Sequence, residues 1–192
     1  MPYTKLLATQ WLAKTNELIE AHPLKKKEIV ASVLAAWKAI FKSDIGGFKI
    51  GKEIKPDPQI IAFFLHELIP LELAAKHPGV WRRGAASDEK DLVCIQDPKF
   101  SVEIKASSHK TNIFGNRSYA QAPTTQKKSK NGYYITVNFE KFGETQPRVR
   151  LIRFGWLDHT DWTGQAAATG QQAHVSDTAY KGKLAVIYDC GQ

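Results

Sequence analysis

The chain has 192 residues, of which 27 are Lys or Arg and 19 are Asp or Glu, so its formal net charge is +8 at pH 7. Because 43% of its residues are hydrophobic, it can bury a core, which excludes a disordered tail or an acidic scaffold. Its length predicts a single domain, 1–192, with an N-terminal helical region at 1–56 and the core at 57–192.

The cellular compartment is predicted from what the sequence lacks. Cys94 and Cys190 are too few for a disulfide framework, which favours a reducing interior. No apolar run reaches the roughly 18 residues of a membrane span, and the N-terminus has no signal-peptide core. We therefore expect a cytoplasmic protein with no membrane partner.

Helical patterns dominate the first half of the chain. Apolar spacing predicts a helix over 3–21, ended by Pro23, and a second over 26–41. Asp57 followed by Pro58 predicts the start of a third helix, with Asp57 capping its free amides. That helix is apolar nearly all round, so we expect it to be buried, and Pro70 should kink or end it.

From residue 91 onward the pattern becomes extended. Two runs, 91–95 and 100–105, are joined by the turn 96–99 and predict a hairpin. Further strands are expected at 132–140, 148–156 and 183–189, and irregular segments at 107–131 and 157–182. The prediction is an α/β fold, with a mixed sheet of about five strands flanked by helices.

The positive charge is concentrated in the second half of the chain. No Asp or Glu lies between Glu103 and Glu140, although this window holds six basic residues: Lys105, Lys110, Arg117, Lys127, Lys128 and Lys130. A second acid-free window after Glu144 carries Arg148, Arg150 and Arg153. A basic patch of this kind predicts a polyanionic partner.

Candidate catalytic residues lie in the predicted hairpin. Alternation along a strand sends Val102 and Ile104 to one face, and Glu103 and Lys105 to the other. Asp91 begins the neighbouring strand, so two carboxylates can share one hard cation, for which Mg²⁺ is the natural choice. The ion would activate a water and neutralise a scissile phosphate, with Lys105 assisting that water.

An alternative is that Glu103 and Lys105 form an exposed ion pair of little energetic value. The placement of Asp91 and the basic window that follows favour catalysis.

The pattern Asp91 with Glu103-Ile104-Lys105 resembles the active-site motif of the PD-(D/E)XK nuclease superfamily, although Lys90 stands where the motif has proline. The resemblance implies Asp91, Glu103 and Lys105 as catalytic residues and the backbone oxygen of Ile104 as a further metal ligand. Many such enzymes recruit another Glu from an N-terminal helix. Glu67 is a candidate, with pairing to His66 or a nearby Lys as the alternative.

Three longer strings, at 64–72, 113–121 and 154–159, resemble the ScaI-type family of type II restriction endonucleases. This resemblance implies a restriction-endonuclease-like core and a bacterial enzyme that hydrolyses double-stranded DNA at a short palindromic site. It also implies Mg²⁺ as cofactor, no small-molecule cofactor, and a homodimer, because a two-fold site is matched by a two-fold protein.

The first acid-free window and the small, uncharged, amide-rich segment 164–172 supply candidate DNA contacts. Lysines hold phosphates, Arg reads guanine, and Asn or Gln reads adenine. The candidates are Lys110, Asn112, Asn116, Arg117, Gln121, Lys127, Lys128, Lys130, Gln171 and Gln172.

Structural alternatives exist for each of these segments: a solvated loop, an Asn116-Arg117 turn, and, for 164–172, a surface helix or a dimer contact. Asp158 to Asp161 has metal-ligand residue types, but a turn after a strand is the better interpretation. For the whole chain, the alternatives are a structure-specific repair or junction nuclease and a DNA-binding module without catalysis.

Overall fold

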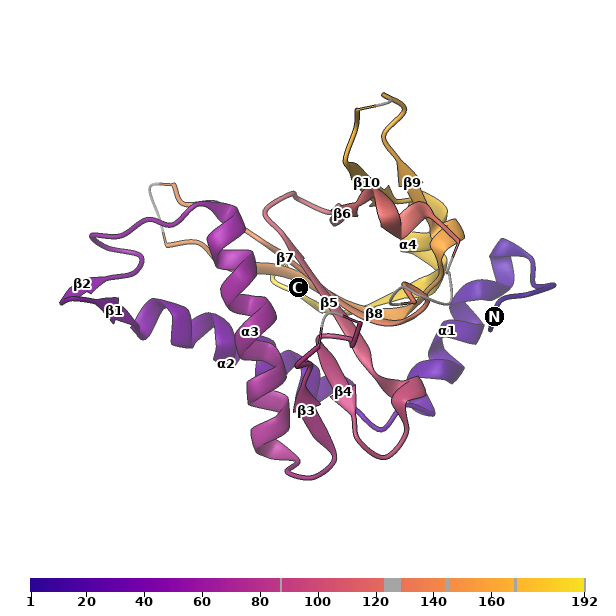
Figure 1. The fold of residues 1–192 in the computed structure, drawn as a ribbon, viewed down its shortest axis with the longest axis horizontal. Coiled ribbons are helices and arrows are strands. Elements are labelled where there is room, and N and C mark those ends of the chain that lie inside the picture. Colours follow the sequence, from indigo (N-terminus) through magenta and orange to yellow (C-terminus); the bar gives the residue numbers. More distant parts are fainter. Residues whose placement is uncertain (87, 123–128, 144–145, 168, 192) are drawn as a thin grey trace.

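A mixed six-stranded sheet forms the centre of the computed structural model, which describes residues 1–86, 88–122, 129–143, 146–167 and 169–191 (Figure 1). In sheet order the strands are β11 (Leu184–Asp189), β8 (Val149–Leu157), β7 (Gly132–Phe139), β5 (Val102–Ser107), β4 (Leu92–Cys94) and β3 (Trp81–Arg83). Among the described strands of this sheet, β5 and β7 are the one parallel pair. The predicted α/β class is confirmed, and β3 is a sixth strand that the sequence pattern did not indicate.

The predicted hairpin is β4 and β5, paired antiparallel with Leu92 opposite Val102. Its connection is a 3₁₀ turn, η2 (Pro98–Phe100), and Asp97 accepts a hydrogen bond from the Lys99 backbone N–H at 3.2 Å. The strands are shorter at the turn side than expected, because Phe100 belongs to η2. Continuing the register by one residue places Asp91 opposite Glu103.

The N-terminal helices differ from the prediction at one end. A 3₁₀ turn, η1 (Ala8–Gln10), leads into α1 (Trp11–Glu20), so the expected start at Tyr3 is wrong. Lys5 has a φ of 68°, which a right-handed helix cannot contain. The second helix, α2 (Lys26–Lys42), lies where the sequence predicted it and leads into a short hairpin, β1 (Asp44–Ile45) with β2 (Phe48–Lys49).

The third helix, α3 (Pro58–Lys76), continues through Pro70, so of the two expected effects of Pro70, a kink or an end, the end is wrong. Asp57 makes no side-chain cap, although its backbone carbonyl accepts from Ile60 and Ile61. The expectation of full burial is also wrong. One face packs on α2, β3 and β5, but Ile60, Phe63 and Leu71 are 48%, 59% and 50% exposed.

By its length and its mean hydropathy of 1.3, α3 is long and apolar enough to cross a membrane, in contrast to the expectation that no apolar run reaches the length of a span. Its contacts with α2, β3 and β5 are those of a helix packed on the protein core. Within the described residues it is the one helix with this property.

The two segments expected to be irregular pair with each other. They contribute a three-stranded sheet, β6 (Phe114–Asn116), β10 (Gln172–Val175) and β9 (Trp162–Gly164), in that order. They also hold η3 (Arg117–Ala120), η4 (His159–Asp161) and α4 (Asp177–Lys183). Figure 1 shows β6, β9, β10 and α4 grouped at one side of the large sheet.

Buried side chains form two clusters on opposite faces of the large sheet. The larger contains side chains of α1, α2 and α3 together with Val102, Ile104 and Ile135. The smaller includes Tyr119, Tyr134 and Trp162, among other residues of the small sheet and α4. The predicted alternation along β5 is therefore confirmed, and Glu103 and Lys105 point toward the smaller cluster.

Candidate active site

Asp91 and Glu103 lie together at the start of β4 and β5. The Oδ2 atom of Asp91 accepts a hydrogen bond from the backbone N–H of Ile104 at 2.6 Å. His66, on α3, places its Nδ1 atom 3.8 Å from the same oxygen. Within the described residues no group of three or more His, Cys, Asp or Glu is arranged to hold a metal, so any ion here would rest on two carboxylates, backbone and solvent.

Glu103 is 2% exposed, which rules out the exposed ion pair as its description. Its Oε1 atom accepts hydrogen bonds from Lys105 Nζ at 3.0 Å and from the Tyr119 hydroxyl at 2.5 Å. Lys90 Nζ lies 3.9 Å from the other oxygen. A carboxylate buried this deeply requires such partners, because an uncompensated buried charge is costly.

The side chain of Lys105 is 12% exposed and lies beside Glu103. Its Nζ atom donates to Glu103 and, at 3.1 Å, to the backbone carbonyl of Ile104. It also lies 4.9 Å from the centre of the Tyr119 ring. These contacts fix the ammonium on the polar side of β5.

Tyr119 and Lys90 are two site residues that the sequence reasoning missed. Burial, followed by the charge of Glu103, raises the pKa of Tyr119 far above its usual value, so its hydroxyl remains a donor. The nearby Tyr134 has its pKa raised by the same causes. Lys90 could have been found from its position next to Asp91, whereas Tyr119 reaches the site only through the fold.

A cavity of about 410 Å³ opens beside Asp91, lined by residues of α3, β3 and the segment after β3. Glu67 lines it, but is only half-buried, and pairs with Arg83 of β3 at 2.6 Å. The alternative expectation, that Glu67 pairs with His66 or a lysine, is therefore wrong. Its partner is Arg83, which lies on β3, the strand that the sequence pattern did not indicate.

The DNA-contact candidates fall into separate places. Lys130 precedes β7, and its Nζ atom lies 4.5 Å from the Tyr119 ring centre, close to the catalytic candidates. Lys110 is exposed and lines a cavity with Glu140 and Arg148. Asn112 lies near the other end of β7, where its carbonyl accepts from Asn138. Lys127 and Lys128 lie outside the described residues.

The remaining candidates gather at the small sheet, where Asn116 is opposite Gln172. Asn116 accepts from the Ser118 backbone N–H at 3.1 Å, and Arg117 donates to the carbonyls of Ala167 and Gly170, each at 3.2 Å. These are the contacts of a structural Asn-Arg turn. Gln121, Gln171 and Gln172 are exposed. At 164–167 and 169–172, the described parts of the segment, the chain forms a strand end, bends, a turn and a strand start, and not the alternative surface helix.

The arginine side chains of the second basic window interact with other residues of the protein. Arg153 is buried and donates to Asn138 Oδ1 at 3.0 Å, and Arg148 and Arg150 both pair with Glu140. Its arginines are therefore less available to a partner than their sequence density indicated.

A sequence profile of the ScaI restriction endonuclease family matches residues 1–188 of the chain. The chain belongs to this family. It is 47% identical over 196 residues to the type II restriction enzyme ScaI of Streptomyces caespitosus, across 100% of this chain and 86% of that protein. No solved structure matches it. The expected restriction endonuclease, a site-specific nuclease that binds DNA, is confirmed.

The three strings that carried the resemblance occupy distinct places in this ScaI-family chain. The first, 64–72, lies on α3 and contains His66 and Glu67; the second, 113–121, contains β6 and η3 with Tyr119. The third, 154–159, spans the end of β8 and the start of η4. Two of the three strings therefore contribute side chains beside the Asp91–Glu103 pair.

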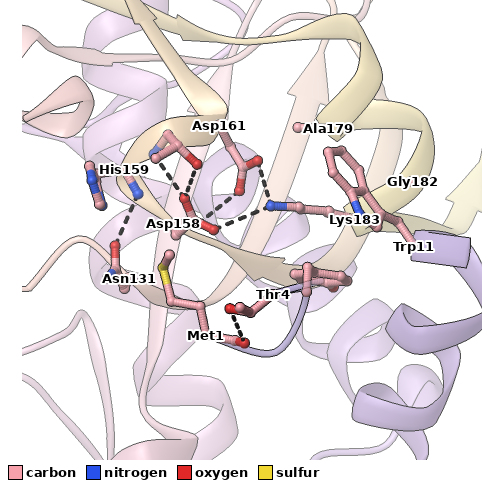
Figure 2. A network of polar contacts seen from close by, with 12 residues as sticks. Met1, Thr4, Trp11, Asn131, Asp158, His159, Asp161, Ala179, Gly182 and Lys183 are labelled. Atoms are coloured by element: carbon pink, nitrogen blue, oxygen red, sulfur yellow. Dashed lines mark hydrogen bonds and ion pairs between the residues drawn. The ribbon is translucent and has the colours of Figure 1, made fainter. Parts of the chain in front are cut away.

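Asp158, in the third string, belongs to a buried network of ion pairs in this ScaI-family chain (Figure 2). Lys183 Nζ lies 3.2 Å from Asp158 and 2.7 Å from Asp161, with the Trp11 ring 4.6 Å away. Asp158 also accepts from the Thr160 backbone N–H at 2.8 Å. The interpretation of 158–161 as a turn after a strand is confirmed, because η4 follows β8 directly.

Proposed function

We propose that this restriction endonuclease hydrolyses phosphodiester bonds of double-stranded DNA at a short palindromic site with Mg²⁺. Asp91 and Glu103 would hold the ion, the backbone oxygen of Ile104 would be a further ligand, and Lys105 would be the catalytic lysine. The observation that carries the proposal is the carboxylate of Glu103, which is 2% exposed, lies opposite Asp91 and accepts a hydrogen bond from Lys105. Bacterial cytoplasm is the proposed location.

The donor set suits the proposed ion. Asp91, Glu103 and the Ile104 carbonyl offer hard oxygen atoms, and Mg²⁺ takes one or two carboxylates, with water and phosphate oxygens completing its shell. When bound, the ion supplies positive charge for the scissile phosphate and acidifies a water. Glu67 would join this set only by exchanging its ion pair with Arg83.

The chain's own residues orient the reaction. An ammonium has three donors, and Lys105 uses two of them on Glu103 and on the Ile104 carbonyl. The third would hold the attacking water or an oxygen of the scissile phosphate, where charge develops. Glu103 fixes that ammonium and Asp91 fixes the Ile104 backbone, so both carboxylates also orient the lysine.

We assign Lys110, Lys127, Lys128 and Lys130 to phosphates, and Asn112, Asn116, Arg117, Gln121, Gln171 and Gln172 to the recognition surface. The position of Lys130 beside Tyr119 supports its assignment, because a phosphate contact there would be next to the scissile bond. Asn116 and Arg117 would act chiefly by shaping the small sheet that presents the glutamines.

A homodimer is part of the proposal. It is supported by large apolar side chains that are exposed on α3, Ile60 and Phe63, and on the β1–β2 hairpin, Ile45 and Phe48.

The chain as a single endonuclease domain is also part of the proposal. It is supported by one hydrophobic cluster whose members run from Ile19 to Ala185.

A plasmid or phage genome incubated with the protein and Mg²⁺ tests this function. Discrete bands that disappear with a chelator, with fragment ends sharing one short palindrome, are expected, and Asp91→Ala, Glu103→Ala and Lys105→Ala should each abolish them. Cleavage by all three single variants would refute the site. Preferential cutting of flaps or branches over intact duplex would indicate a junction nuclease. Binding of DNA without any cutting would indicate a DNA-binding module.

A further inference from the structure

We propose that Tyr119 is a positioning residue, which holds the Glu103 carboxylate and the Lys105 ammonium in their working arrangement and thereby sets the affinity of the site for its metal ion. The inference rests on the proposed roles of Glu103 and Lys105. Tyr119 would touch neither the ion nor the DNA; it would act through these two side chains.

The phenol is bonded to the oxygen that also binds the lysine. Its hydroxyl donates to Glu103 Oε1 in a buried environment, and Lys105 donates to the same oxygen from β5. The second oxygen of Glu103 faces Lys90. Because Oε1 accepts from two directions, rotation of the carboxylate would break both bonds, which limits the side chain to one orientation.

The ring has a second role beside its hydroxyl. Lys105 Nζ and Lys130 Nζ lie 4.9 Å and 4.5 Å from its centre, within the range of cation–π attraction. One aromatic ring therefore places the proposed catalytic lysine and a proposed phosphate-binding lysine next to each other.

The position of the ring is built by its surroundings. It packs on Trp162 with ring centres 4.7 Å apart, and a Cβ atom added at Gly115 would lie 2.7 Å from its Cδ2 atom, closer than such atoms approach. The turn η3 that carries it is tied down at Arg117, whose backbone N–H donates to the Gln171 carbonyl at 2.7 Å. Gly115 therefore leaves the space that Tyr119 fills.

Tyr119→Phe is the decisive variant, because it removes the hydroxyl and keeps the ring. Tyr3→Phe is its matched control: Tyr3 is equally buried, and its hydroxyl bonds one side chain, Thr15, at 2.8 Å. Mg²⁺ binding to each protein without DNA would be followed by calorimetry. Cleavage would be measured over a range of Mg²⁺ concentrations, DNA binding without metal by gel shift, and folding by thermal melting.

For Tyr119→Phe we expect Mg²⁺ affinity to fall about tenfold or more, the usual effect of removing a group that orients a metal ligand. The Mg²⁺ concentration for half-maximal cleavage should rise by a similar factor, while metal-free DNA binding stays as in the wild type. Tyr3→Phe should leave the Mg²⁺ affinity unchanged. Gly115→Ala, which displaces the ring without removing the hydroxyl, should shift the Mg²⁺ dependence in the same direction as Tyr119→Phe.

The inference would be overturned if Tyr119→Phe bound Mg²⁺ as tightly as the wild type and its cleavage showed the same dependence on Mg²⁺ concentration. An equal loss in Tyr3→Phe would also overturn it, since the effect would then be one of stability. Both results leave the proposed function intact, provided that Glu103→Ala abolishes cleavage. If Glu103→Ala cleaves normally, it is the proposed function that fails.

Discussion

Asp91 and the backbone of Ile104 are joined by a hydrogen bond of 2.6 Å, from the N–H of Ile104 to Oδ2 of Asp91. The bond ties the residue before β4 to the middle of β5. Asp91 therefore has a structural partner in addition to its proposed role at the metal, and the two roles can be separated by substitution.

Asp91→Asn should keep the Ile104 bond through its amide oxygen and lose the negative charge, whereas Asp91→Ala loses both. We expect cleavage to fall at least about a hundredfold in each. Asp91→Ala should also lower the free energy of unfolding by about 1–2 kcal/mol, because the amide loses its acceptor. Urea unfolding and plasmid cleavage check this, and equal stability of the two variants would contradict the structural role.

Lys105→Met should reduce cleavage by at least about a hundredfold, the usual contribution of a positioned proton donor or acceptor. Metal-free DNA binding should persist, because the other lysines remain. Lys99→Met is the matched control: Lys99 lies in the same hairpin, exposed and paired with Asp97 at 2.7 Å. If both variants lost cleavage equally, the effect would belong to the hairpin and not to the ammonium.

Lys183→Met should destabilise the protein by about 3–5 kcal/mol, because it leaves Asp158 and Asp161 buried without their cation. Lys181→Met, two residues away on the exposed side of α4, should change the free energy of unfolding by less than about 0.5 kcal/mol. Chemical denaturation measures both. A small effect of Lys183→Met would show that the two carboxylates find other partners.

His22 should make stability depend on pH. Burial lowers its pKa to about 4, so the folded protein keeps it neutral while the unfolded chain protonates it near pH 6.5. The unfolded state thus binds more protons between these values, and stability should be complete above pH 6.5 and fall by about 3 kcal/mol as the pH drops to 4.

The test for His22 is a set of unfolding curves from pH 7.5 to 4. His22→Asn should flatten the slope between pH 6.5 and 4, and His174→Asn, at an exposed histidine of β10, should retain it. An unchanged slope in His22→Asn would assign the acid sensitivity to other groups.

The candidate catalytic residues could be predicted because they depend on local geometry. A hairpin and strand alternation suffice to bring Asp91, Glu103 and Lys105 together. The burial of Glu103 was not predictable in this way, since it requires Tyr119, which arrives through pairing of β6 with β10, more than 50 positions along the chain. Strand β3 was missed because three residues are too few for a periodic pattern.

The helical errors have equally local causes. Apolar spacing extended the predicted first helix back to Tyr3. Tyr3 is buried and its hydroxyl is hydrogen-bonded to Thr15, but it does not belong to the apolar stripe of a helix. In α3 the proline removes only one backbone bond, and packing against α2, β3 and β5 retains the helix to Lys76.

The two-sided pairing of β5 affects how the enzyme would lose activity on heating. β5 bonds β4 on one side and β7 on the other, so slippage by one residue would turn Val102 and Ile104 out of the core and bury Lys105 among apolar side chains. Such a displaced strand has no stable state. Because the proposed catalytic residues Glu103 and Lys105 lie on β5, thermal inactivation should coincide with cooperative unfolding of the sheet, and a folded but inactive form should not accumulate.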